Sequence, residues 1–452
     1  MIPPQIAANA NANANANANA TTATTATTAA AAAADSDPRA PAQPSADQPT
    51  PHATSQPAQP AADLLAPLPG LAIAALSLAA LASGASIRVT DPLLPRLAQA
   101  FSISLGEASQ AITAYAVAYG LAQLLFGPLG DRYGKYRVIA WACAASALST
   151  TACALAQSHG ALLVARLAAG ATSAAVTPLA MAWLGDVVPY AQRQPVLARF
   201  LIGQITGFAL GVWAGGYAAE HLNWQTPFWG IAAVFAGAAV LMQMMRRRLP
   251  ARAVLTQAPA GHPLRRMQRE FAAVLAVPWA RRVLVTVFLE GVTLFGALAF
   301  VAAHLHQRFG LPLSQAGAML MLFAAGSLAF SLNAYWLVPR LGEARLVRTG
   351  ATLMAGALLG LAVAPSWGWA VPACAALGLG YYMMHNTLQT HATQMAPERR
   401  GAAVASFAAC LFLGQSLGVA LAGWVVDRAG AGWVLGAGAL GLLALGWRFP
   451  KK

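Results

Sequence analysis

Apolar residues recur in stretches of about twenty from roughly residue 66 to the end of the chain, and short polar segments separate them. As an α-helix, with a rise of about 1.5 Å per residue, such a stretch crosses a hydrocarbon core about 30 Å thick. Helices are favoured because backbone groups in lipid must be satisfied within their own segment, and the short alternating segments of a membrane barrel do not occur. The pattern therefore predicts an all-α membrane protein whose twelve spans are 68–98, 108–129, 137–157, 160–186, 195–219, 226–246, 283–304, 313–338, 346–364, 369–393, 401–426 and 431–448.

The spans fall into two sets of six that repeat each other. The sequence Gly-Gln-Ile-Thr-Gly at 203–207 recurs as Gly-Gln-Ser-Leu-Gly at 414–418, and the segment 132–137 aligns with 340–345. Parallel repeats of this kind are a known internal symmetry of polytopic membrane proteins. We predict two six-helix bundles related by a pseudo-two-fold axis, formed by residues 63–246 and 283–452.

Two segments lie outside the predicted bundles. Residues 1–62 are low in complexity, with an Asn-Ala repeat and almost no large apolar side chains. They cannot bury enough surface to offset the entropy of ordering, so we predict a disordered cytoplasmic tail. Residues 247–282 form a basic cytoplasmic linker with one acid, Glu270. Its arginines are Arg247, Arg248, Arg252, Arg265, Arg266, Arg269, Arg281 and Arg282.

Composition and charge agree with a membrane protein. The chain is 58% hydrophobic and 9% charged, whereas about a quarter of a soluble domain is charged. The net charge of +14 is not expected to bind nucleic acid, because no recognised module accompanies it. With the N-terminus inside, basic residues concentrate in inner loops, which predicts a multi-pass protein of the cell inner (cytoplasmic) membrane with both termini cytoplasmic. The exceptions are Arg88, Arg96, Arg308 and Arg428 outside, and Arg166 within a span.

The segment 127–138, GPLGDRYGKYRV, lies between the second and third spans. An ordinary basic loop would need neither Asp131 at a helix end nor glycines at both flanks, where we expect a close backbone approach. The segment resembles the loop signature G-x-L-x-D-R-x-G-R/K of the major facilitator superfamily, with matches at Gly127, Leu129, Asp131, Arg132, Gly134 and Lys135. The resemblance implies that these residues and Asp186 form a charge network that acts as a conformational switch.

Other spans extend the resemblance across the chain. Arg166 and Gly170 match the family pattern R-x-x-x-G, although Ala169 replaces its customary glutamine. Residues 207–216 resemble the antiporter signature G-x3-G-P-x2-G-G, with Val212 in place of the proline. Glycines at this spacing also serve simply to pack helices closely.

Residues 91–95, Asp-Pro-Leu-Leu-Pro, resemble the opening of drug-exporting and arabinose-efflux-permease-like members. The combination is most similar to the twelve-span drug–proton antiporter branch. It implies proton-coupled efflux of small amphipathic molecules, drug-like or sugar-like, by alternating access. The partners would be the substrate, protons and the lipid bilayer, and the protein would be a monomer.

Two other functions stay open. One is a proton-coupled importer or symporter of the same fold, which the Val212 departure favours. The other is a non-transporting membrane sensor, which could dispense with intramembrane charges.

No nucleophile elbow or phosphate-binding loop occurs, so we expect no enzyme activity, no catalytic residue and no cofactor. The cysteines lie singly in apolar runs, so we expect neither a metal site nor a disulfide. They are Cys143, Cys153, Cys374 and Cys410.

Ionisable residues within a membrane are costly and mark functional sites. Asp91 and Arg166 lie at similar depth, so we predict that they approach each other, with Arg88 competing for the acid. Protonation of Asp91 would loosen such a pair and couple transport to protons. Glu290, without a basic partner in its own span, is the second candidate for proton coupling. The alternatives are a structural ion pair and a water-facing acid.

Polar residues in the spans that line the central cavity in the superfamily together predict an aromatic and amide-lined substrate cavity, although each taken alone is better explained by a hydrogen bond between helices. They are Tyr115, Tyr119, Gln204, Asn333, Tyr381, His385, Asn386, Gln389 and Gln415. Histidines near span ends, His304, His306 and His391, are expected to be solvated.

Overall fold

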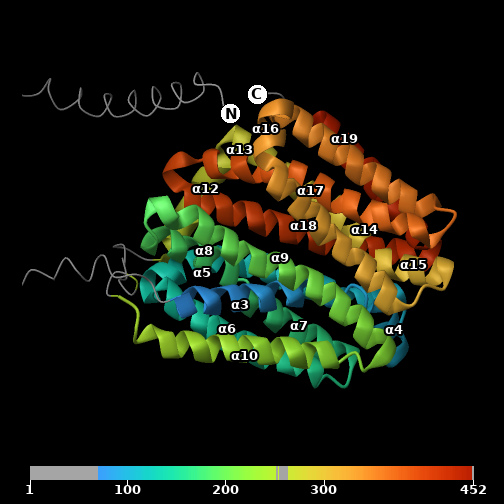
Figure 1. The fold of residues 1–452 in the computed structure, drawn as a ribbon, viewed down its shortest axis with the longest axis horizontal. Coiled ribbons are helices and arrows are strands. Elements are labelled where there is room, and N and C mark those ends of the chain that lie inside the picture. Colours follow the sequence, from blue (N-terminus) through green and yellow to red (C-terminus); the bar gives the residue numbers. More distant parts are fainter. Residues whose placement is uncertain (1–69, 251–252, 254–262, 450–452) are drawn as a thin grey trace, which may run out of the picture. The chain divides into compact units, whose positions relative to one another are not determined.

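The computed structural model describes residues 70–250, 253 and 263–449, and every regular element in this part is a helix. The predicted tail at 1–62 lies outside the described residues. Figure 1 shows the elements in order of sequence. The first half contains α3 (Gly70–Arg88), α4 (Leu94–Phe101), α5 (Leu105–Tyr133), α6 (Lys135–Ala154), α7 (His159–Ser173), α8 (Val176–Val187), α9 (Tyr190–His221) and α10 (Thr226–Arg246).

The second half begins within the segment predicted as a linker, residues 247–282, part of which is itself helical. Its elements are α12 (Pro263–Ala276), α13 (Pro278–Glu290), η1 (Gly291–Phe295), α14 (Gly296–Leu298), α15 (Val301–Phe309), α16 (Leu313–Val363), η2 (Trp367–Trp369), α17 (Ala370–Gln394), η3 (Pro397–Arg399), α18 (Arg400–Ala429) and α19 (Ala431–Arg448).

Twelve membrane-spanning helices account for this pattern. In the described part of the chain, ten helical runs are long and apolar enough to cross a bilayer. One of these, α16, joins two helices across a kink at Gly342, whose φ of 68° is not helical. α17 has 25 residues and is also long enough. When the two arms of α16 are counted separately and α17 is added, the described helices correspond to the twelve spans of the predicted all-α membrane protein.

Three of the predicted spans are not continuous α-helices. The span predicted at 68–98 breaks after Arg88 into a turn, and α4 then starts beside Pro95. The break lies where Pro92 and Pro95 remove backbone donors. The span 160–186 divides between α7 and α8, and the span 283–304 contains the π-helical turn η1 directly after Glu290. Single π-turns of this kind are common at functional sites.

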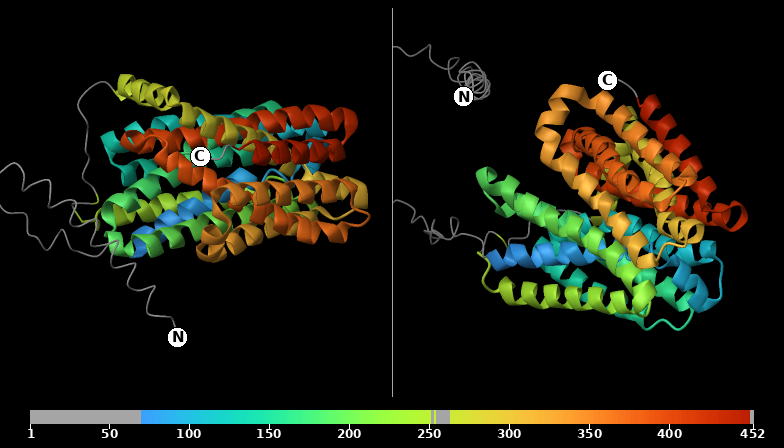
Figure 2. Two further views of the ribbon diagram at one scale, coloured as in Figure 1. Left: turned by 90° about the horizontal axis from the view of Figure 1, so that it is seen from above. Right: turned by 45° about the vertical axis from the view of Figure 1, so that its right-hand side comes forward.

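The helices pack mainly within their own half. In the first half α3 packs on α9 and α10, and α5 packs on α7; in the second, α16 packs on α17 and α19, and α18 packs on α13 and η1. Two seams join the halves, α5 against α18 and α9 against α16. The views in Figure 2 agree, with the blue and green helices of the first half beside the yellow to red helices of the second.

Glycines let the helices within each half approach closely, at positions that repeat. Gly207 lies against the backbone of Leu81 in α3, and a Cβ added at Gly211 would stand 2.6 Å from the carbonyl oxygen of Ala85. In the second half, Gly414 and Gly418 of α18 lie against the backbone of the span that contains η1. The repeat found in the sequence at 203–207 and 414–418 is therefore also a repeat of helix packing.

The seams are closed at one end of the helices. Following the orientation that the charge pattern predicts, we call this the outer end, and the opposite end the inner end. Ser416 Oγ donates to the carbonyl of Thr113 at 3.3 Å, and Gly216 lies against the carbonyl oxygen of Leu313. At the inner end of the first arm of α16, Tyr335 is 95% exposed. The halves therefore meet near the outer end, whereas the inner end of the first arm of α16 is exposed.

Candidate functional site

A buried ion pair follows the break after α3. The break exposes the last residue of the helix, Arg88, to the acid three residues later. Arg88 Nη1 lies 3.0 Å from Asp91 Oδ2, and both side chains are buried. Charges removed from water are stabilised only when they are paired. The pair thus explains how both groups can lie inside the protein.

Arg166 of α7 is held differently from the prediction. Its Nε donates to the carbonyl of Ala111 and its Nη1 to that of Ser86, both at 3.1 Å. The guanidinium also lies 4.1 Å from the ring centroid of Tyr115. In the described residues Asp91 forms its ion pair with Arg88 and not with Arg166, whose Nε and Nη1 donate to backbone carbonyls and whose buried Nη2 has no hydrogen-bond partner there. Arg166 still lies near enough to act on Asp91 electrostatically.

Glu290, at the end of α13, forms a second buried acidic site. Its Oε2 lies 2.9 Å from Nδ1 of His385 on α17, and the Glu290 side chain is fully buried. Its own span offers no base, as predicted, and α17 supplies the partner. The His385 ring stacks on Tyr381 at a centroid distance of 4.7 Å and also contacts Phe407 of α18 at 5.2 Å. Four helical segments thus meet around one carboxylate.

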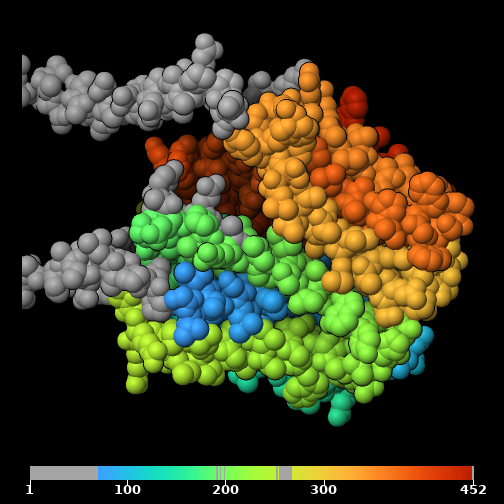
Figure 3. Space-filling view, in the orientation of Figure 1, coloured from blue at the N-terminus to red at the C-terminus, as the bar shows by residue number. Residues whose placement is uncertain are grey.

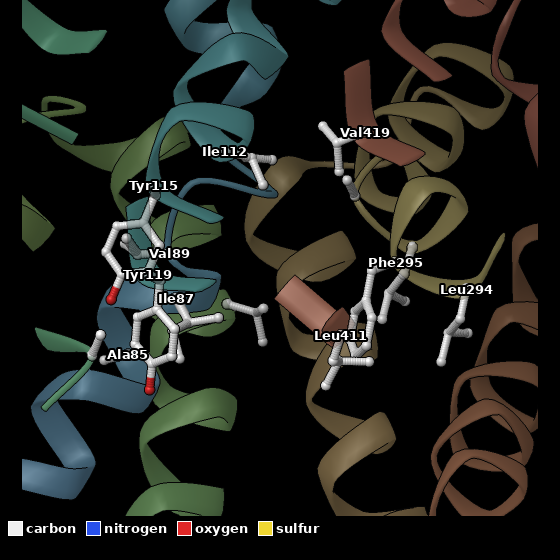
Figure 4. Packing of buried hydrophobic residues seen from close by; sticks show 14 of the residues in the cluster. Ala85, Ile87, Val89, Ile112, Tyr115, Tyr119, Leu294, Phe295, Leu411 and Val419 are labelled. Atoms are coloured by element: carbon white, nitrogen blue, oxygen red, sulfur yellow. The ribbon is translucent and has the colours of Figure 1, made fainter. Parts of the chain in front are cut away.

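Aromatic side chains face each other across the boundary between the halves. Tyr115 and Tyr119 are stacked on α5, with centroids 5.8 Å apart. Tyr119 reaches Phe412 of α18 at 4.2 Å. Figure 4 shows the two tyrosines on one side, and Phe295 and Leu411 on the other. The predicted cavity residues Tyr115 and Tyr119 of α5 therefore lie opposite Phe295 and Leu411 of the second half in one buried region.

The remaining predicted cavity residues are dispersed. Gln415 is buried in α18, and Gln204 donates to Thr177 Oγ1 at 3.2 Å. Asn333 is exposed and donates to Ala329 in its own helix. The other two, Asn386 and Gln389, are exposed on α17.

A groove of about 440 Å³ lies between the inner parts of α3 and α9. In Figure 3 the blue surface of α3 is visible between α9 and α10 on this side of the molecule. The predicted cavity residues do not line it, so it is separate from the paired acids. Its lining residues are Gly70, Ile73, Ala74, Ser77, Leu78, Leu81, Arg199 and Gly203.

The predicted switch loop is almost entirely helical. α5 continues to Tyr133 and α6 begins at Lys135, so only Gly134, with a φ of 89°, separates them. Lys135 Nζ lies 2.5 Å from Asp186 and 3.8 Å from Asp131.

Three charges of the predicted network are thus together, while Arg132 lies over the ring of Tyr133. Gly130 is closely packed against Leu179. Gly127, in contrast, has no neighbour within 4 Å of an added Cβ among the described residues, so the expected close approach there is wrong.

The second copy of this loop has the same backbone. Gly342 has a positive φ, as Gly134 does at the aligned position. Its neighbour Glu343 lies 3.3 Å from His391, so an acid stands where Lys135 stands in the first half. His391 is therefore buried and paired, and the expectation that it is solvated is wrong. His304 is likewise buried, with Nε2 3.1 Å from the carbonyl oxygen of Leu361.

The outer ends hold two contacts that the sequence reading missed. Asp427 of α18 accepts hydrogen bonds from Ser104 Oγ at 2.7 Å and from the amide of Gly106 at 2.8 Å. Glu220 of α9 accepts from the hydroxyl of Ser314 at 2.5 Å and from its amide at 3.0 Å. Each carboxylate caps the first turn of a helix in the opposite half, where free amides and the helix dipole favour an anion. An acid at the outer end of each glycine-rich span was the available signal.

The ionisable groups of the site are carboxylates paired with bases. The described residues contain no cluster of ligands that could hold a metal ion. Two carboxylates, Asp91 in the first half and Glu290 in the second, are buried beside bases. Protonation of such a carboxylate removes an ion pair and alters contacts between helices. The site can therefore convert proton binding into a change of packing.

The sequence model of a family described as "Major Facilitator Superfamily" matches residues 76–419. The chain is 25% identical over 347 residues, 76% of this chain and 86% of the relative, to "Uncharacterized MFS-type transporter YceJ" of Bacillus subtilis (strain 168). It is 30% identical over 141 residues, 31% of this chain and 33% of the relative, to "Probable efflux pump mfs2" of Aspergillus flavus.

Solved structures with the same fold include the human organic anion transporter MFSD10, with a TM-score of 0.65, 18% identity, and coverage of 84% of this chain and 99% of that one. Nucleoside transporter NupG gives a TM-score of 0.68 at 14% identity, covering 84% of this chain and 98% of that one. At these identities the likeness concerns the fold alone.

Proposed function

The chain belongs to the Major Facilitator Superfamily, and on that premise we propose that it exports small amphipathic molecules in exchange for protons. It is a multi-pass protein of a transporter family and not an enzyme. The proposed substrates are drug-like or sugar-like, and alternating access of two six-helix bundles, residues 63–246 and 283–452, would move them. The similarity to a relative named as an efflux pump supports the direction.

The observation that carries the proposal is the pair of buried acids, one in each half. Asp91 and Glu290 are each fully buried beside a base, Arg88 or His385. A purely structural bundle has no need of either acid, because replacing a buried ion pair by apolar side chains is often neutral or stabilising. Ionisable groups at this depth favour proton coupling.

The geometry of the two ends supports alternating access. The outer end is held by the caps at Asp427 and Glu220 and by contact across both seams. The inner end carries the charge network of Lys135, Asp131 and Asp186. A molecule closed outside and open inside would accept substrate from the cytoplasm, which is the first step of export.

We also propose an orientation in the membrane and a cellular location for the protein. The inner end would face the cytoplasm of a cell whose inner membrane holds the protein, with both termini inside. The residues 247–282 would link the bundles on that side, and a monomer would suffice for transport. Tyr115, Tyr119, Tyr381 and His385 would contact the substrate.

An efflux-deficient host provides the test. Cells that express the chain would be screened for growth against toxic amphipathic compounds and for accumulation of labelled sugars. Growth restored by the wild-type chain, and lost with Glu290→Gln at equal membrane level, is the expected result. A host that becomes more sensitive to a compound would instead indicate import.

Import by the same fold is the second candidate, and Val212 is the observation that favours it. α9 continues as a helix through Val212, whereas a proline there would remove a backbone hydrogen bond. Val212→Pro separates the two candidates. An exporter would keep or gain gradient-driven efflux in this variant, whereas an importer would show no efflux with either residue.

A further inference from the structure

Arg88 contacts both halves of the molecule at once. Its guanidinium pairs with Asp91 at 3.0 Å in the first half. The same guanidinium lies 5.3 Å from the ring centroid of Phe295, in the π-helical turn η1 of the second half. Arg88 is 7% exposed, and a cation over an aromatic face is most stabilised when water is excluded. One cation therefore ties an acid of one half to an aromatic ring of the other.

From Phe295 a continuous series of contacts leads to the second acid. The ring of Phe295 meets Tyr381 edge to face at 5.5 Å, and Tyr381 stacks on His385 at 4.7 Å. His385 then bonds to Glu290 at 2.9 Å. Tyr381 lies within electrostatic reach of both Arg88 and Glu290.

Both acids are incompletely satisfied. Within the described residues, Asp91 Oδ1 and Glu290 Oε1 are buried and accept no hydrogen bond. A buried carboxylate oxygen that accepts no hydrogen bond is destabilising. Each acid therefore gains from a proton or from a further positive group, and Arg88, paired with Asp91, is linked to Glu290 by this series of contacts.

We propose that Arg88 is the positioning residue that couples the two acids, serving Asp91 in the state seen and Glu290 when Asp91 is protonated. This inference rests on the proposed proton exchange. Protonation of the Asp91 carboxylate would leave the guanidinium without its counter-ion, and Glu290, beyond Phe295 and Tyr381, would attract it. The approach of Arg88 to Glu290 would favour release of any proton held there.

The other polar groups around this path are accounted for. Arg166 of α7, which lies over the ring of Tyr115, acts on Asp91 from the first half, and His385 of α17 faces Glu290. Arg166 donates to two backbone carbonyls, which hold it in place. Arg88 is held by the ion pair with Asp91 and by the contact with the Phe295 ring, and both are side-chain contacts that can be replaced by others.

Infrared titration of the purified, detergent-solubilised protein tests the coupling without a substrate. The carboxylic acid C=O bands would be assigned by their loss in Asp91→Asn and Glu290→Gln. In Arg88→Gln the midpoint of the Glu290 band should change by about one pH unit, the size expected for the loss of a nearby charge. An unchanged Glu290 midpoint would overturn the proposal.

Transport measurements give a second, independent test in reconstituted vesicles, with a compound identified by the growth screen. Arg88→Gln should reduce gradient-driven transport about tenfold or more but leave substrate counterflow within about twofold, and Arg88→Lys should restore part of it. Phe295→Leu should reduce gradient-driven transport about threefold, since it removes the ring contact but keeps the ion pair. Phe309→Leu, which removes the ring that lies 5.5 Å from Arg308, is the control.

Gradient-driven transport unaffected in both Arg88→Gln and Phe295→Leu would contradict the role of Arg88. Failure of the proposed function is a distinct result, in which the wild-type protein ignores the pH gradient. The infrared titration still decides on Arg88 in that case. If Arg88→Gln does not fold, Phe295→Leu and Arg88→Lys decide in the same assays.

Discussion

The chemistry of this protein depends on single buried residues, of which Glu290 is an example. The carboxylate is buried where α13 gives way to the π-helical turn η1, and among the described residues it is paired with His385, a side chain from α17. Asp91 depends in the same way on the break that ends α3 at Arg88. Irregular backbone at this depth is tolerated where it is covered by protein. Both acids thus lie beside the irregularities that make them possible.

Glu290→Gln should separate proton coupling from folding. The amide can still hydrogen-bond to His385 but cannot take up a proton, so gradient-driven transport should fall about tenfold or more while counterflow persists. Transport by vesicles with and without a pH gradient measures both. Glu107→Gln, in an exposed capping box of α5, is the control, and equal losses of the two activities would speak against a coupling role.

The sequence identified these residues but not their partners. Asp91, Arg166 and Glu290 were conspicuous as charges in apolar spans. The preference of Asp91 for Arg88 depends on where Arg166 finds backbone carbonyls, and the preference of Glu290 for His385 depends on how α17 packs on α13. Tertiary packing determines these ion-pair partners, so they cannot be predicted from a single sequence.

At the scale of helices, glycines at repeated positions and carboxylates that cap helices of the opposite half determine how the elements pack. Gly207 and Gly211 bring α9 onto α3, and the aligned Gly414 and Gly418 do the same in the second half. Periodic apolar stretches predict such helices well, because spanning lipid demands length and internal hydrogen bonds. The breaks after Arg88 and at η1 were not predicted, since a proline or glycine marks a possible break without deciding it.

Gly207→Ala should destabilise the packing of α3 on α9. The added Cβ would meet the backbone of Leu81, and overpacking typically costs about 1–3 kcal/mol. Thermal unfolding of the detergent-purified protein should show a lower midpoint than the wild type. Gly237→Ala, where nothing lies within 4 Å among the described residues, is the matched control; an equal effect of both changes would contradict close packing at Gly207.

Asp427→Asn should weaken the outer closure. The amide accepts less strongly than the carboxylate from Ser104 and Gly106, and loss of a helix cap typically costs about 1 kcal/mol. A cysteine introduced at Thr113, in a background without the natural cysteines, should react with an impermeant maleimide from outside about fivefold faster. Glu220→Gln should act in the same direction at the other seam. Labelling rates that do not change in either variant would show that these caps do not hold the outer end.

The whole molecule is a repeat whose halves have diverged in charge. Gly134 and Gly342 adopt the same positive φ at aligned positions, yet Lys135 pairs with acids in the first half while Glu343 pairs with His391 in the second. The aligned segments of the sequence predicted this symmetry. The sequence did not predict that the second pair has its acid, Glu343, at the position of the base Lys135, because the partner His391 lies on another helix.

Asp131→Asn should slow transport more than it weakens substrate binding. The Lys135 network lies at the inner end, far from the buried acids, so its loss should change the rate of switching by about tenfold and affinity by less than about twofold. Binding by isothermal titration and transport by vesicle uptake measure the two. Asp186→Asn should behave alike, and parallel losses of binding and transport would exclude a switching role.

The central claim is exchange of substrate for protons, and everted membrane vesicles test it most directly. With the lumen acidified, vesicles that contain the wild-type chain should accumulate a screened compound, release it when the gradient is collapsed, and do neither with Asp91→Asn or Glu290→Gln. Accumulation that is indifferent to the gradient, or expulsion of the compound from an acidic lumen, would contradict the account.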